Sequence, residues 1–447
     1  MQKNTAQAFS VKEEREYGRK MLTTIRCEFP LVNELDVNQY FNCLEQEILD
    51  AAGPQYFTYH FYVINDNELN AFAAPSGLIF IHSGMVRKTD NEGELMSVIA
   101  HEVAHVVSRH IAGRSERAPK LTAATLALVL AGMALGAGPL SEAFIVGGMA
   151  GGRSMNLKYS REDEEEADRK AIELMRKMNR DLKDMLSMLK KLHRLYKIRM
   201  GNIPQYLLTH PIPKTRMNYV EDLINLYSSD DYKNIEKFPF DRIQLRLGII
   251  TGDLEKLEKK YRRILEEDGT EQYEQMIARY GLALILHKNG HYEKAISNLK
   301  EVMSFFKDKP VIWTDLGRIY LDSGDTDMAL RFFEKTRSTE TGNMYNNYYL
   351  AIALEKKGNL ARAEKLYQQV RGHIKDYPPV YKHIARINDQ RDKKGDSYYY
   401  LGLHYFYAGD FATSKIHLQN AKADLDKNNP KQKEIDDILS RIDEYRS

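Results

Sequence analysis

The sequence has very little cysteine and no excess of charge of either sign. Only Cys27 and Cys43 occur among 447 residues, which excludes a disulfide-rich scaffold and the Cys-x-x-Cys patterns of many zinc and redox sites. The two thiols are either free or joined in one bridge. The 65 lysines and arginines nearly balance 63 aspartates and glutamates, so no overall field attracts nucleic acid. Nucleic acid is therefore not expected as a partner.

The N-terminal residues also lack the apolar segment of a secretory leader. Residues 1–5 lead directly into the charged run at 12–16. The sequence therefore predicts either a cytoplasmic protein or one from which a leader has been removed.

The length favours two domains, which we place at 1–226 and 241–447, with a polar connector at 227–240. In the first domain, apolar residues at helical spacing predict helices over 11–28, 35–52, 90–111, 160–177 and 182–200. Aromatic and β-branched residues over 57–64 predict a β-like stretch, and the segment 70–81, which follows a polar turn at 65–67, predicts a hairpin.

The second domain is repetitive. Gly290, Gly324 and Gly358 are spaced by 34 residues, and Ala295, Ala329 and Ala363 follow them at the same period. The arrangement resembles the tetratricopeptide repeat, in which paired helices stack through small residues. A copy around Gly409 implies an inserted helix near 380–391, and a degenerate first unit is placed near Gly252. The alternative is a plain helical bundle with coincidental glycines.

An uncharged apolar run covers residues 121–141, and a second small-residue run covers 143–152. The first is long enough to span a bilayer, but the second is too short to return through a core of about 30 Å. We therefore expect 121–152 to form a mobile helical lid or to rest on a membrane surface as a peripheral contact.

Residues 101–105 read His-Glu-Val-Ala-His, the H-E-x-x-H pattern of zinc peptidases. His101 and His105 lie one helical turn apart, so both imidazoles project from one face and can share one cation. Glu102 is rotated away from that face, which suits it to accept a proton from the attacking water. The bland alternative is a pair of structural histidines on an amphipathic helix.

A catalytic zinc ion usually has a third protein ligand, and the acidic segment 160–168 can supply it. Glu164 and Asp168 share one helix face, so Glu164 could bind the metal while Asp168 orients a ligating imidazole. Three neighbours remain rivals for the ligand position: Glu162, Glu165 and Glu166. An acidic face at the start of a helix is also explained by the helix dipole alone.

The H-E-x-x-H helix with the later Glu164 and Asp168 resembles the glutamate-type zinc peptidases, which include the CAAX prenyl endopeptidases and the HtpX heat-shock proteases. Segment 70–75 and the His210-Pro211 pair followed by Arg216 are similar to segments of that family. Ser76 stands where the family often has glycine. The nearest resemblance is to the BepA-like periplasmic peptidases with a tetratricopeptide tail, which survey outer-membrane protein assembly.

This resemblance implies further roles. His210 is a candidate fourth ligand that holds the enzyme latent, although a histidine before proline is more often a turn residue. Arg216 is a candidate contact to the oxyanion or the substrate, or a helix cap. An extended substrate is expected to pair with an edge strand that comprises Asn70, Leu78, Ile79, Phe80 and Ile81. The resemblance also implies a periplasmic location and protein partners of the outer-membrane assembly machinery.

The predicted fold class is α+β: a mainly helical zincin-like domain with a small sheet, followed by an all-α tetratricopeptide solenoid. The predicted function is hydrolysis of peptide bonds in protein or peptide substrates with one Zn²⁺ per chain, while the repeats bind clients or partners. One rival is a largely latent chaperone or adaptor that acts by binding. Another is a membrane-embedded prenyl-protein peptidase.

Overall fold

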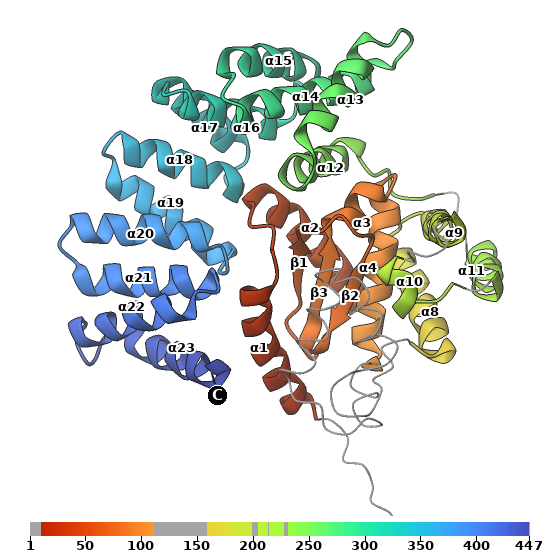
Figure 1. Ribbon diagram of the computed structural model, residues 1–447, viewed down its shortest axis with the longest axis horizontal. Coiled ribbons are helices and arrows are strands. Elements are labelled where there is room, and N and C mark those ends of the chain that lie inside the picture. Colours follow the sequence, from red (N-terminus) through yellow and green to blue (C-terminus); the bar gives the residue numbers. More distant parts are fainter. Residues whose placement is uncertain (1–9, 111–158, 199–203, 213, 228–230, 447) are drawn as a thin grey trace, which may run out of the picture. The chain divides into compact units, whose positions relative to one another are not determined.

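The computed structural model describes residues 10–110, 159–198, 204–212, 214–227 and 231–446 (Figure 1). It divides into two compact units. Unit 1 comprises Met1–Val32 and Tyr40–Gln244, and unit 2 comprises Asn33–Gln39 and Leu245–Ser447. The predicted membrane-contact segment 121–152 lies outside the described residues. Among the helices that are described, none combines the length and apolar character needed to cross a membrane.

The helices of unit 1 begin and end close to where the apolar spacing places them. Ser10 caps the first helix and Ser160 caps the helix at 161, each in a capping box with the acidic residue three positions later. The bounds are α1 Val11–Glu28, α2 Leu35–Ala52, α3 Ser83–Lys88, α4 Glu92–Val107, α8 Arg161–Lys177, α9 Lys183–Ile198, α10 Gln205–Thr209, α11 Lys214–Tyr227 and α12 Lys237–Thr251, the last of which continues into unit 2.

A three-stranded sheet in the order β1-β3-β2 lies between α1 and α4 (Figure 1). Its strands are β1 His60–Ile64, β2 Ala71–Ala74 and β3 Leu78–His82. β2 and β3 form the predicted hairpin around a 3-10 turn, η1 Pro75–Gly77, while β1 pairs with β3 in parallel. Ser76 adopts a φ of 70°, a left-handed conformation that glycine reaches more easily.

The predicted substrate edge strand is corrected by this topology. Residues 78–81 belong to β3, which is hydrogen-bonded to β1 on one side and to β2 on the other. A central strand has no free backbone groups for an added peptide, so a substrate cannot pair with it. The sequence showed two apolar runs but not which of them would take the middle position.

The two faces of the sheet pack on different helices. Phe72 and Phe80 stack on one face with ring centroids 5.0 Å apart, and Met21 and Ile25 of α1 cover them in one core cluster. Alternate residues of β2 and β3 point to the other face, where α4 packs. The helix with the H-E-x-x-H motif therefore lies directly against β2.

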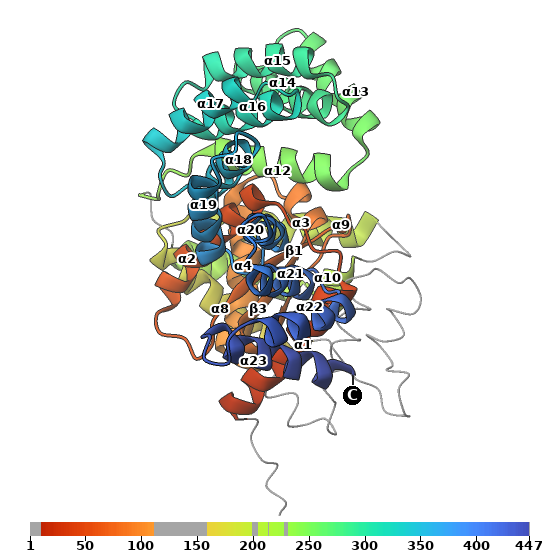
Figure 2. The same cartoon turned by 90° about the vertical axis from the view of Figure 1, so that its left-hand side faces the viewer.

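Unit 2 consists of stacked helices (Figure 2). Turns at Gly290, Gly324, Gly358 and Gly409 have positive φ angles between 78° and 95°, as the repeat period predicted. The bounds are α13 Leu254–Glu266, α14 Gln272–Lys288, α15 Tyr292–Phe305, α16 Pro310–Asp322, α17 Thr326–Thr339, α18 Met344–Lys356, α19 Leu360–His373, α20 Pro378–Gln390, α21 Lys394–Tyr407, α22 Phe411–Asp424 and α23 Lys431–Arg446.

Small residues let the paired helices approach closely. Ala295, Ala329 and Ala363 are fully buried, and a Cβ added to Gly317 would lie 2.6 Å from a ring carbon of Phe333. The predicted fold class, a mainly helical α+β domain with helical repeats, is therefore confirmed.

Candidate metal centre

Helix α4 supplies the two histidines of the motif. Asn91 caps it by accepting a hydrogen bond from the Glu94 N–H at 2.8 Å, and residues 92–106 are buried. His101 Nε2 and His105 Nε2 lie 3.1 Å apart. The structure thus brings the two imidazoles together on one face of the helix, as the spacing predicted.

Helix α8 brings its acidic face to the same place. Glu164 is 4% exposed, and its carboxylate lies 3.6 Å from His101 Nε2 and 3.5 Å from His105 Nε2. The rivals Glu162, Glu165 and Glu166 do not belong to the candidate metal-binding cluster that the described residues form. That cluster consists of His101, His105, Glu164 and His210, whose ligand atoms all lie within 4.8 Å of one another.

The donor set fits a zinc ion. A tetrahedral zinc ion with bonds of about 2.0–2.1 Å holds its donor atoms about 3.3–3.4 Å apart. The Nε2 atoms of His101 and His105 are 3.1 Å apart, Glu164 Oε2 lies 3.6 Å from His101 Nε2, and Glu164 Oε1 lies 3.5 Å from His105 Nε2. A shared cation would bind the two imidazole nitrogens, which face each other at 3.1 Å, together with an oxygen of Glu164.

Asp168 and Arg216 lie behind these ligands. Asp168 Oδ1 is 3.0 Å from His101 Nδ1, the position that the prediction of an orienting carboxylate requires. Arg216 donates to both oxygens of Asp168, from Nε at 2.7 Å and from Nη2 at 2.8 Å. Its Nη1 donates to Glu164 and to the Pro211 carbonyl. The structure therefore places Arg216 beside the carboxylates, where all three of its nitrogens are engaged, and not at an open oxyanion position.

Glu102 points toward the sheet side of the centre. The Ala73 N–H of β2 donates to Glu102 Oε2 at 3.0 Å. Oε1 accepts no hydrogen bond within the described part of the chain and lies 3.6 Å from His210 Nε2. Burial raises the pKa of the Glu102 carboxyl group above its ordinary value. One carboxylate oxygen is thus anchored and the other is available to accept a proton.

His210 reaches the centre from the end of α10. Its Nδ1 lies 3.4 Å from His101 Nε2 and 2.8 Å from Glu164 Oε1. The ring stacks on Tyr206 and Tyr159, with centroid distances of 4.6 and 4.8 Å. The structure therefore brings His210, which the sequence alone could not place, into the same cluster.

The two motif histidines experience different electrostatic environments. Burial disfavours the charged form of His101, but hydrogen bonds with Asp168 and Glu164 outweigh it and raise the pKa of His101 to about 9. Burial lowers the pKa of His105 well below its ordinary value, so this imidazole stays neutral. Although burial opposes ionisation, Arg216 and His210 hold the pKa of Glu164 well below its usual range. A charged carboxylate and a neutral imidazole are the forms that bind a metal.

Sequence reasoning missed three residues of this centre. Tyr159 stacks on His105 with a centroid distance of 3.8 Å, and Tyr206 stacks on His210. His110 Nδ1 lies 2.8 Å from His105 Nδ1. The only local signal was a third histidine five positions after His105. The contacts of the two tyrosines depend on the tertiary fold and left no pattern in the sequence.

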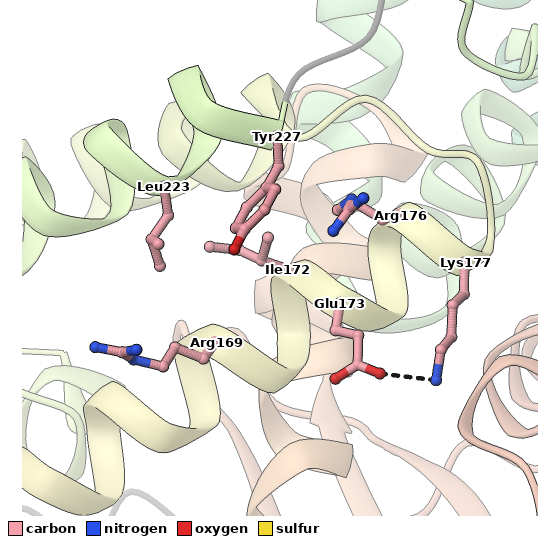
Figure 3. A pocket seen from close by; sticks show the side chains of 7 residues that line it. All are labelled: Arg169, Ile172, Glu173, Arg176, Lys177, Leu223 and Tyr227. Carbon is pink, nitrogen blue, oxygen red and sulfur yellow. Dashed lines mark ion pairs between the residues drawn. The ribbon is translucent and has the colours of Figure 1, made fainter.

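One hollow of the described structure is separate from this centre. A cavity of about 620 Å³ lies between α8 and α11 (Figure 3). Within it, the Arg176 guanidinium lies over the Tyr227 ring at 4.5 Å, and Lys177 pairs with Glu173 at 2.8 Å. It is lined by Arg169, Ile172, Glu173, Arg176, Lys177, Leu223 and Tyr227. None of the candidate metal ligands lines this cavity.

The two cysteines, Cys27 and Cys43, are not bridged. The structure therefore decides between the two alternatives that the sequence left open.

The chain is similar to known metallopeptidases. A beta-barrel assembly-enhancing protease of Yersinia pestis is 30% identical over 297 residues, which are 66% of this chain and 60% of that protein. The mitochondrial metalloendopeptidase OMA1 of Schizosaccharomyces pombe is 27% identical over 208 residues, 46% of this chain and 56% of that protein. The chain thus spans 60% of the length of the Yersinia relative.

The crystal structure of MamA covers 41% of this chain and 99% of its own, with 14% identity and a TM-score of 0.31. Residues 278–308 and 314–378 match tetratricopeptide repeats. Residues 36–224 match peptidase family M48. The chain therefore carries a peptidase domain of family M48, followed by tetratricopeptide repeats.

Proposed function

We propose that the chain is a zinc-dependent endopeptidase whose metal is held by His101, His105 and Glu164. The observation that supports this most strongly is the convergence of these three side chains at zinc-like donor spacings, with Glu102 beside them. A zinc ion bound there polarises the substrate carbonyl and lowers the pKa of water to about 7.

The remaining work falls to residues of the chain. Glu102 Oε1 accepts the proton of the attacking water, because its pKa is raised and Oε2 is fixed by the Ala73 N–H. Asp168 fixes the ring of His101 through Nδ1. Arg216 fixes Glu164 and compensates the buried negative charge.

We place the substrate along β2 instead of β3. β2 lies at the edge of the sheet beside α4, and its Ala73 N–H points away from β3 toward Glu102. An extended peptide on this side passes next to the candidate general base. Asn70 precedes β2, and its carbonyl accepts a hydrogen bond from the His82 N–H at 3.0 Å, which closes the end of the hairpin.

We propose His210 as a regulatory fourth ligand. Its Nδ1 lies 3.4 Å from His101 Nε2, a separation suited to two ligands of one zinc ion. A histidine in the fourth position keeps water and substrate out, so removal of this side chain is expected to raise the basal peptidase rate.

We also propose that the enzyme works in the periplasm on outer-membrane proteins, with the repeats binding clients or the assembly machinery. The support is the name of the Yersinia relative, a beta-barrel assembly-enhancing protease, together with the repeats, which commonly present protein-binding surfaces. The alternative, a latent chaperone or adaptor, gains support from the occluding position of His210.

The test compares two zinc-loaded proteins, the His210→Ala variant and the double variant with His210→Ala and Glu102→Gln. The measurement is cleavage of a quenched fluorescent peptide library. Loss of the base is expected to slow cleavage about 10²- to 10⁴-fold without loss of bound zinc. Glu173→Gln serves as the control, because this carboxylate on α8 is exposed and forms an ion pair with Lys177. Equal absence of cleavage with and without Glu102 would favour the chaperone or adaptor.

A further inference from the structure

The position of His105 determines where its proton lies. Its Nε2 faces the centre, 3.1 Å from His101 Nε2 and 3.5 Å from Glu164. An imidazole binds a metal through an unprotonated nitrogen, so the proton of neutral His105 must be on Nδ1. The partner of Nδ1 is another imidazole nitrogen, His110 Nδ1 at 2.8 Å.

This assignment fixes the state of His110 as well. His110 Nδ1 must accept from His105, so the proton of neutral His110 is on Nε2. Nε2 lies 3.3 Å from Glu166 Oε2, a carboxylate that can accept that proton's hydrogen bond. A single arrangement therefore satisfies both contacts: His105 Nδ1–H donates to His110, and His110 Nε2–H donates to Glu166.

The backbone is shaped to place His110 there. Helix α4 ends at Val107, and Arg109 adopts a φ of 53°, which is unusual for a residue other than glycine. Arg109 is held in this turn by Glu14, which accepts from its Nε at 3.1 Å and its Nη2 at 3.0 Å. A left-handed residue that neighbouring groups hold in place often marks a functional position. Here the turn brings His110 back beside His105.

The far end of this series of contacts is also held. Glu166 Oε1 accepts from Ser108 Oγ at 2.9 Å and from Lys170 Nζ at 2.8 Å. Lys170 also donates to Ser108 Oγ at 2.8 Å. These contacts fix one oxygen of Glu166 and leave Oε2 facing His110.

We infer that His110 is a positioning residue that fixes the tautomer and ring orientation of His105 for metal binding, with Glu166 as its own acceptor. The inference rests on the proposed metal site. Different groups would then orient the two motif histidines. The carboxylate of Asp168 orients His101, and the neutral imidazole of His110 orients His105.

The test measures zinc affinity of the full chain by competition with a chromophoric chelator, and the visible spectrum of the Co²⁺ form. His110→Leu removes the acceptor and is expected to weaken zinc binding about 10- to 100-fold and to alter the Co²⁺ spectrum. His110→Asn keeps an oxygen acceptor near the Nδ1 position, so affinity within about threefold of the wild type is expected.

The control is His193→Leu on α9, because neither ring nitrogen of His193 has a hydrogen-bond partner among the residues that the structure describes. Thermal unfolding of the metal-free variants separates misfolding from loss of positioning. The inference is overturned if His110→Leu binds zinc as the wild type does, or if His110→Asn and His110→Leu lose affinity equally. A wild type that binds no zinc would instead overturn the proposed function, and this inference with it.

Discussion

The two units use buried polar groups differently. In unit 1, buried charged side chains from α4, α8 and α11 converge on one centre, where Glu164 and Asp168 share Arg216. In unit 2, buried polar groups connect alternate helices, α14 with α16 and α16 with α18. Asp315 accepts from the hydroxyls of Tyr280 and Tyr345, and Thr314 Oγ1 lies 3.1 Å from Asn346 Oδ1. Buried polar groups thus converge around Arg216 in one unit and connect stacked helices in the other.

Removal of the buried guanidinium of Arg216 is expected to destabilise unit 1 alone. Arg216→Met leaves Asp168 and Glu164 without their guanidinium partner, which is expected to lower the free energy of unfolding of unit 1 by about 3–5 kcal/mol. Trp313, the only tryptophan, lies on α16 of unit 2, so its fluorescence reports that unit separately. In urea unfolding of metal-free Arg216→Met, the transition seen by circular dichroism should therefore begin at a lower urea concentration than the transition seen by Trp313 fluorescence.

Arg169→Met on the same helix as Glu164 is the matched control, because Arg169 is exposed and lies over the Tyr219 ring at 5.1 Å. Its effect should stay within about 0.5 kcal/mol. Equal shifts for the two arginine variants would show that the buried carboxylates do not depend on Arg216.

Overpacking of a contact between two helices is expected to destabilise unit 2. Gly317→Ala places a Cβ 2.6 Å from a Phe333 ring carbon, and overpacking of this kind costs about 1–3 kcal/mol. Gly372→Ala is the same change within α19, where an added Cβ meets open space within the described part of the chain. Because alanine is the better helix former, this control should be neutral or slightly stabilising.

The readout is the Trp313 fluorescence transition in urea, with zinc affinity measured in parallel. Gly317→Ala should lower the transition midpoint and leave zinc affinity unchanged. The comparison between the units is wrong if both glycine variants behave alike, or if Gly317→Ala reduces zinc binding.

The smallest expected effect is a dependence of unit 2 on pH. Burial opposes ionisation of Glu355, but hydrogen bonds from His383 and Tyr367 lower its pKa from 4.5 to about 2. A depressed folded-state pKa stabilises the protein above pH 4.5, and this contribution is lost as the pH falls toward about 2. Glu355→Gln should therefore flatten the pH dependence of the Trp313 transition in this range.

Glu293→Gln, an exposed change on α15, controls for the altered net charge. A wild-type slope that persists in Glu355→Gln would assign the acid sensitivity to other groups.

Much of the fold could be predicted because its signals are local. The caps at Ser10 and Ser160 and the apolar spacing after them mark where α1 and α8 begin. The 34-residue period of Gly290, Gly324 and Gly358 predicted the repeats, because each repeat contacts mainly its neighbours. The strand order was not predicted, because pairing of β1 with β3 joins residues across a crossover and leaves no periodic signal.

The candidate site was predictable to the extent that it follows helix geometry. Spacing by four residues brought forward His101 with His105 and Glu164 with Asp168, and the structure places all four together. The roles of Arg216 and His110 were not predictable. Arg216 is 48 residues from Asp168, and His110 depends on the left-handed turn at Arg109.

The most direct test of the metal centre is anomalous diffraction at the zinc absorption edge from crystals of the full chain grown with Zn²⁺. We expect one anomalous peak per chain within about 2.0–2.2 Å of His101 Nε2, His105 Nε2 and a Glu164 oxygen. Zinc bound elsewhere on the chain, with these three side chains making no bond to it, would show that they do not form the metal site.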